Sequence, residues 1–75
     1  MEQYKNLSGR SGVAAYELGD GSITVEFKDG GRYLYTDASA GPENIRQMRR
    51  LAQCGAGLAT FINRVVRERY AHGQH

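Results

Sequence analysis

Arginine is the residue type of this sequence with the clearest capacity for binding chemistry, and it is concentrated in the second half. Residues 44–75 contain six arginines and one glutamate, a net charge of +5, whereas residues 1–43 contain four basic and seven acidic side chains, a net charge of −3. The guanidinium group is planar and suits paired contacts to phosphate as well as stacking on bases. Five of these arginines and one asparagine form the candidate nucleic-acid-binding set of the helices: Arg46, Arg49, Arg50, Asn63, Arg64 and Arg67. The alternative is that these side chains form only a solvated helix surface.

Two tyrosines, Tyr33 and Tyr35, are the second candidate for a binding role. They lie two residues apart in RYLYT, residues 32–36, and side chains at that spacing on a strand point to the same face. Burial of the pair places more apolar area in the core than burial of Leu34 between an arginine and a threonine, so the sequence favours burial. If the pair is exposed instead, it offers a platform on which bases stack beside the arginines.

Other classes of site find little support in the sequence. The two histidines, His72 and His75, lie in the C-terminal tail, and two such histidines with one cysteine do not make a closed metal site. The carboxylates fall mostly in predicted turns and on the polar face of a strand, and nothing points to a catalytic pair. We therefore expect no enzymatic activity, no cofactor and no metal. Cys54 is expected to be a small core or near-core residue, because cysteine buries readily.

The glycine-rich segment at residues 55–57 reads GAG. It follows a predicted helix rather than a strand, and Thr60 stands where a dinucleotide-binding fingerprint would place glycine. We interpret the segment as a turn between two helices. The alternative is that the free N–H groups at the start of the second helix hold a phosphate.

The sequence contains no signal for membrane insertion or export. No stretch approaches the ~18 consecutive apolar residues that a membrane span requires. The first ten residues, MEQYKNLSGR, lack the apolar run of a signal peptide. The single cysteine excludes an internal disulfide, as is common in reducing compartments. We therefore predict a cytoplasmic protein with no membrane partner.

Three strands are predicted in the first half, at residues 13–18, 22–28 and 32–36. In the second of them apolar and polar residues alternate, which indicates a half-buried strand. The segments between the strands read GDG and DGG, and such glycine pairs tolerate the positive φ that tight hairpins need. The three segments therefore predict an antiparallel meander with one face to cover.

Two helices are predicted in the second half. Pro42 suits the first position of a helix, and an apolar stripe extends from Ile45 to Ala52. Gly55 is expected to end this helix in the left-handed conformation. Residues 58–70 show a second apolar stripe, at positions 58, 61, 62, 65 and 66, and the last five residues are expected to fray.

The order of these elements sets the expected fold class. Strands followed by helices predict an α+β domain, a three-stranded antiparallel meander with both helices packed on one face. The length allows one domain, residues 1–75, with a core at about 11–71 and short flexible termini.

The order of the motifs resembles the KTSC domain family, named after the C-terminal domain of some lysyl-tRNA synthetases. That family also occurs as short stand-alone bacterial and phage proteins. Its features are a strand ending in phenylalanine, an Asp/Asn-Gly turn, a Y-x-Y strand, and two helices joined by a glycine turn, with an Arg-x-x-Tyr-like end. Here they are VEF at 25–27, DGG at 29–31, YLY at 33–35 and LAQCGAGLATFINRVVRERY at 51–70. The resemblance covers residues 11–71 and implies RNA as the suggested ligand.

Together these features lead us to expect a small, non-enzymatic binding module. The first expected ligand is RNA or another nucleic acid, bound through the helix arginines and Asn63, with the two tyrosines stacking if they are exposed. The alternative is a protein-interaction or homodimerisation module. In that case a partner strand adds to an exposed sheet edge, at residues 13–18 or 32–36.

Overall fold

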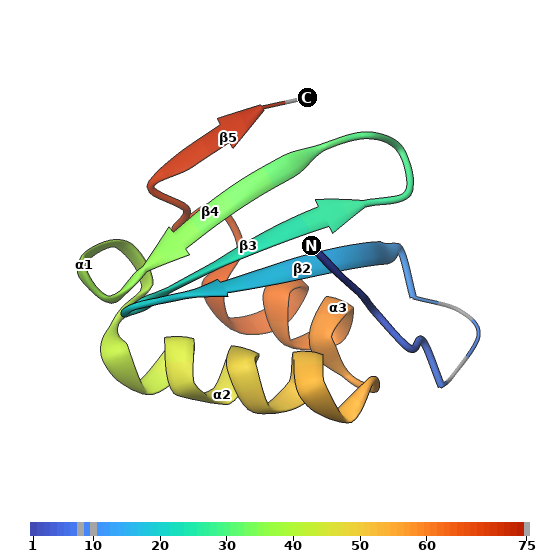
Figure 1. The fold of residues 1–75 in the computed structure, drawn as a ribbon. Coiled ribbons are helices and arrows are strands. Elements are labelled where there is room, and N and C mark those ends of the chain that lie inside the picture. The colour runs from blue at the N-terminus through green and yellow to red at the C-terminus, as the bar shows by residue number, and fades with distance from the viewer. Residues whose placement is uncertain (8, 10, 75) are drawn as a thin grey trace.

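The protein folds as one sheet with helices against one of its faces. A computed structural model describes residues 1–7, 9 and 11–74. Figure 1 shows α2 and α3 beneath the sheet, and the opposite face carries no helix of the described chain. The strands are β1 (Glu2–Gln3), β2 (Val13–Gly19), β3 (Ser22–Phe27), β4 (Arg32–Thr36) and β5 (His72–Gln74). The helices are α1 (Asp37–Ala40), α2 (Pro42–Cys54), α3 (Leu58–Phe61) and the π-helical turn η1 (Ile62–Val66). The predicted α+β class is confirmed.

The central meander of β2, β3 and β4 matches the sequence prediction. Both of its pairings are antiparallel, and the register sets Ile23 opposite Tyr35 and Val25 opposite Tyr33. Directly opposed residues share a face of the sheet. The two tyrosines of RYLYT therefore point to the same side as the apolar residues of β3, toward the helices.

Both edges of the meander are extended by the ends of the chain, so the sheet has five strands in the order β1-β2-β3-β4-β5. Figure 1 shows β5 beside β4. β1 pairs with β2 at two positions, and β5 pairs with β4 at three. The expected count of three strands is wrong, and so is the expected fraying of the tail at residues 72–74. Neither terminal strand is long enough to show the alternation of apolar and polar residues that predicts a strand. Each is extended because its backbone pairs with the strand beside it.

The N-terminal segment also reaches the core. Tyr4 is 4% exposed, and its hydroxyl accepts a hydrogen bond of 3.3 Å from the backbone N–H of Leu58. The backbone N–H of Leu7 donates to the carbonyl of Gly55 at 2.8 Å. These contacts hold the N-terminal segment against the turn between α2 and α3, so the packed part of the chain begins before residue 11.

The helices agree with the prediction at α2 and differ after it. Gly55 ends α2 with φ 87° and ψ 17°, the left-handed conformation expected of it. A short helix, α1, precedes α2 and begins with a capping box between Thr36 and Ser39. The predicted helix over residues 58–70 ends at Val66 instead. No helix in the described part of the chain is long and apolar enough to cross a membrane.

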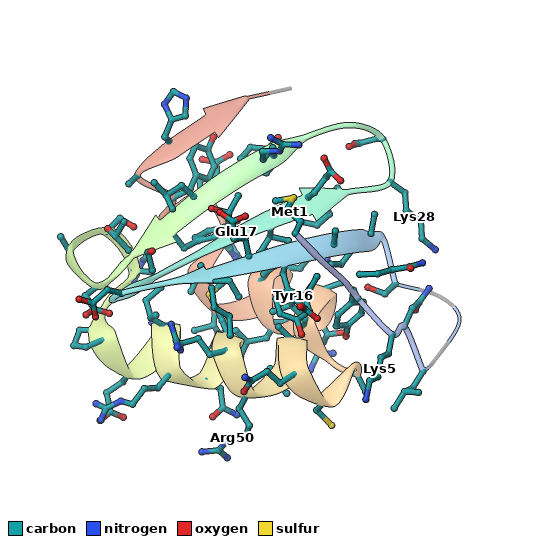
Figure 2. The ribbon with its side chains drawn as sticks, in the orientation of Figure 1. Met1, Lys5, Tyr16, Glu17, Lys28 and Arg50 are labelled. Atoms are coloured by element: carbon teal, nitrogen blue, oxygen red, sulfur yellow. The ribbon has the colours of Figure 1, made fainter. Side chains whose placement is uncertain are left out.

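The core lies between the sheet and the helices. Figure 2 shows Tyr16 extending from β2 toward α2. Two predicted core positions are wrong, since Val65 is 42% exposed and Cys54 is exposed. The wider π-helical turn aligns every fourth residue with the sheet and turns Val65 to solvent, while Cys54 falls outside the apolar stripe of α2. The buried residues are Tyr4, Val13, Tyr16, Ile23, Val25, Tyr35, Ala40, Ile45, Met48, Ala52, Leu58, Ile62 and Val66.

Candidate functional site

A cleft opens where the end of β3 and the start of β4 face η1 and the chain that follows it. Its volume is about 320 Å³, and we call it the aromatic cleft. It brings together four residues of the predicted binding set: Tyr33 and Tyr35 from β4, Asn63 from η1, and Arg67 directly after η1. The lining residues are Phe27, Tyr33, Tyr35, Ile62, Asn63, Arg67, Glu68 and Tyr70.

Four aromatic rings of the aromatic cleft are in contact with one another, three in its wall and one, Tyr35, in its floor. The centroids of Tyr33 and Tyr70 are 4.8 Å apart with the rings tilted by 47°. Phe27 meets Tyr33 edge-on at 5.7 Å, and Tyr70 meets Tyr35 edge-on at 6.1 Å. Tyr33 is half-buried and Tyr70 is 37% exposed, so part of the wall is open to a flat ligand.

Tyr35 forms the floor rather than the wall. It is 2% exposed, and its hydroxyl donates to the carbonyl of Arg67 at 3.4 Å. Burial raises the pKa of Tyr35 to about 12, with Tyr33 and Tyr70 adding to the shift. The prediction of a buried pair is therefore confirmed for Tyr35, which offers no stacking surface, whereas Tyr33 remains half-buried.

The backbone is strained at Arg67. This residue follows η1 with φ 44° and ψ −110°, and its N–H donates to the carbonyl of Ile62 at 2.6 Å, five residues back. Few residues other than glycine adopt a positive φ, and such conformations cluster at functional sites. π-Helical turns are also frequent at such sites. At this point the chain leaves η1 and brings Arg67 and Glu68 to the cleft.

Three polar side chains of the cleft are free to meet a ligand. Within the described residues, no hydrogen bond or ion pair involves the side chain of Asn63, Arg67 or Glu68. All three residues are exposed. An amide, a guanidinium and a carboxylate, beside aromatic rings, together offer both donors and acceptors to a planar polar ligand.

The arginines of α2 serve a different part of the molecule. The guanidinium of Arg49 donates to the carbonyl of Gly19 at 2.6 Å and to that of Ser22 at 3.4 Å, and Arg49 is half-buried. It thus ties α2 to the turn between β2 and β3. Arg46 lies 3.4 Å from the carboxylate of Glu43. The sequence placed both in the phosphate-binding set; in the structure Arg49 is bonded to backbone carbonyls and Arg46 is paired with Glu43.

Of the predicted helix arginines, only Arg67 lines the aromatic cleft. Arg50 is exposed and extends from α2 on the side away from the sheet (Figure 2). Arg64 is exposed on η1 and does not line the aromatic cleft. Arg46 and Arg49 line a different hollow from the one that Arg67 lines.

Two other hollows lack comparable chemistry. The larger, about 510 Å³, lies between β1, β2 and α2, and the N-terminal amino group stands 3.9 Å from a carboxylate oxygen of Glu17 at its rim (Figure 2). The other, about 410 Å³, contains Arg46 and Arg49 together with the acidic residues Asp20 and Asp37. The aromatic cleft is the smallest of the three, but it combines several rings with three free polar side chains.

Four lining residues of the aromatic cleft were not in the predicted set, namely Phe27, Glu68, Tyr70 and the core residue Ile62. Phe27 ends β3 on the same face as Ile23 and Val25, a signal that the alternation of that strand already contained. Tyr70 was expected to end a helix, and the early end of η1 places it against Tyr33 instead. Glu68 had no signal in the sequence, because only the turn after η1 brings it to the cleft.

The described residues contain no group of three or more histidine, cysteine, aspartate or glutamate side chains that could hold a metal ion. No protein-family model, curated protein or solved structure matches this chain.

Proposed function

We propose that the protein is a small non-enzymatic module that binds single-stranded RNA through the aromatic cleft. The observation that carries the proposal is the meeting of Tyr33, Asn63 and Arg67 in one cleft. Single-strand binders combine positive charge along the backbone with aromatic rings that stack on bases. Recognition of unpaired bases uses stacking together with hydrogen bonds to the base edges.

The proposed roles follow from exposure and charge. The open parts of Tyr33 and Tyr70 take the plane or the edge of one base. Arg67 contacts a phosphate, and the exposed Arg64 on the neighbouring turn adds to the local positive charge. Asn63 donates to or accepts from the base. This arrangement predicts binding that weakens as salt rises, since phosphate contacts release counterions.

The motifs that resemble the KTSC domain give the proposal a second support. The phenylalanine of VEF and the tyrosines of YLY lie in adjacent strands, whereas the Arg-x-x-Tyr motif is distant in the sequence, with Arg67 lying 32 residues after Tyr35. All of them line the aromatic cleft, as Phe27, Tyr33, Tyr35, Arg67 and Tyr70. We propose that the chain is a KTSC-like domain and that these shared motifs define its ligand site.

The alternative of strand addition requires exposed edges at β2 or β4. The two edges on which that hypothesis depended, β2 and β4, are paired with β1 and β5. A partner strand would have to add to the short terminal strands or displace them. The aromatic cleft could instead bind a protein, and the RNA-binding experiment below distinguishes this alternative from the proposed function.

The first prediction uses Arg67→Gly, with Arg50→Gln as its matched control. Each change removes one positive charge, so a general electrostatic effect is the same for both. Glycine also tolerates the positive φ of residue 67, so the fold should persist. We expect Arg67→Gly to weaken binding of a labelled single-stranded RNA of about ten nucleotides by roughly tenfold at low salt, and Arg50→Gln by less than about twofold. Fluorescence anisotropy measures both.

Equal losses in the two variants would contradict a role for the aromatic cleft and indicate diffuse charge binding. Absence of RNA binding by the unchanged protein at low salt would overturn the proposed function and favour a protein ligand. Thermal unfolding of each variant shows whether a loss of binding reflects a loss of fold.

A further inference from the structure

Glu68, the acidic residue of the aromatic cleft, would not favour a ligand that offers phosphate alone. Glu68 is the only acidic side chain in residues 44–75, which contain six arginines. It nevertheless lines the cleft beside Arg67. A carboxylate repels phosphate, so its presence there calls for a ligand group that donates hydrogen bonds.

Glu68 is available to such a group. Its side chain has no hydrogen bond or ion pair within the described residues, although Arg64, Arg67 and Arg69 are near it in the sequence. The residue is exposed. An ionised carboxylate is an acceptor only, with two oxygens that suit a pair of parallel donors.

The bases differ in the donors that they present on the Watson–Crick edge. Guanine presents two adjacent donors, N1–H and the N2 amino group. Adenine presents one donor in its N6 amino group, cytosine one in its N4 amino group, and uracil one in N3–H. Only guanine can therefore satisfy both oxygens of one carboxylate, and a fork of two charge-assisted hydrogen bonds adds both strength and geometric selectivity.

We propose that the aromatic cleft selects an unpaired guanine, whose N1–H and N2 amino group donate to the carboxylate of Glu68. The guanine ring lies against Tyr33 and Tyr70, and its flanking phosphate meets Arg67. The guanine O6 and N7 are acceptors, which suits the amide N–H of Asn63. This inference rests on the proposed function and adds the identity of the base.

The test compares labelled single-stranded RNAs of one sequence that carry guanosine, inosine or adenosine at a single central position. Inosine keeps N1–H and O6 but lacks the N2 amino group, so it removes one of the two proposed hydrogen bonds. We expect the guanosine RNA to bind about tenfold more tightly than either of the others, the effect of one good paired contact. Fluorescence anisotropy at fixed low salt gives the ratio of affinities.

The matched variants are Glu68→Gln and Glu43→Gln. Each removes one negative charge, and Glu43 is an exposed residue of α2 outside the cleft. Glu68→Gln should reduce the guanosine-to-inosine ratio to near one, whereas Glu43→Gln should leave it unchanged. Use of the ratio cancels the general gain in RNA affinity that follows from removing an acidic group.

Two results would overturn guanine selection while leaving RNA binding intact. One is equal affinity of the unchanged protein for the guanosine, inosine and adenosine RNAs. The other is a guanosine preference that persists in Glu68→Gln. If none of the three RNAs binds at low salt, both this inference and the proposed function are overturned.

Discussion

A single hydroxyl explains why tyrosine rather than phenylalanine suits the floor of the aromatic cleft. The ring of Tyr35 packs in the core, opposite Ile23 in the adjacent strand. Its hydroxyl reaches the carbonyl of Arg67, the residue at which the chain leaves η1. Tyr35 thus links the central sheet to the strained turn that positions Arg67 and Glu68.

The buried hydroxyl predicts a loss of stability in alkali. Burial, followed by the nearby Tyr33 and Tyr70, raises the pKa of Tyr35 from 10.0 to about 12. The unfolded chain therefore releases this proton near pH 10, while the folded chain retains it until about pH 12. Because the folded state binds the proton more tightly, its stability is unaffected below pH 10 and falls as pH rises from about 10 to about 12. The fall from this group should be about 2 kcal/mol.

Tyr35→Phe isolates this contribution from that of the other tyrosines. Denaturant unfolding over the same pH range should show a fall in unfolding free energy that is smaller in the variant by about 2 kcal/mol. Near neutral pH the variant loses only the hydrogen bond to Arg67, so a cost of about 1 kcal/mol is expected. Parallel alkaline profiles for the two proteins would show that Tyr35 is not the group responsible.

At the scale of elements, β5 supports the wall of the aromatic cleft. Gly73 lies opposite Tyr33 in the register, and a methyl group added at this position would be 2.7 Å from Cδ1 of Tyr33 and 2.9 Å from Cε1 of Tyr70. Real side chains do not approach so closely, so glycine allows both rings to lie against the backbone of β5. The terminal strand therefore sets the position of the two rings that are open to a ligand.

Gly73→Ala should move these rings, with Gly12→Ala as the control. The Cβ of an alanine at position 12 would lie 3.8 Å from Cδ1 of Phe27, an ordinary van der Waals contact. We expect Gly73→Ala to lower the unfolding free energy by about 1–2 kcal/mol, as overpacking does, and to weaken RNA binding. Gly12→Ala should change either quantity little. Denaturant unfolding and anisotropy measure the two effects, and an unchanged RNA affinity in Gly73→Ala would exclude β5 as a support of the site.

At the scale of the whole molecule, the sequence predicts the elements whose pattern is contained in neighbouring residues. The alternation of β3, the turn glycines and the stripe of α2 led to the central meander, the first long helix and its end at Gly55. The terminal strands and Glu68 could not be predicted in this way, because their places depend on contacts with distant parts of the chain. The candidate arginines were all selected because arginine is concentrated in the second half of the sequence. In the structure, however, Arg49 bonds to the β2–β3 turn and Arg67 lines the aromatic cleft. Only the fold distinguishes these roles.

Both edges of the central meander are covered by the chain's own terminal strands, and we expect this cover to limit self-association. Deletion of residues 71–75 removes β5 and leaves the backbone groups of β4 unpaired, from Arg32 to Leu34. Exposed edges of this kind pair with other chains. We expect the truncated chain to associate more strongly than the full chain as concentration rises, measured by sedimentation velocity, with circular dichroism showing that the sheet persists. Leu34→Lys in the truncated chain should suppress the association, since a charge on an edge strand opposes pairing. A folded truncated chain that sediments like the full chain at every concentration would show that β5 does not protect this edge.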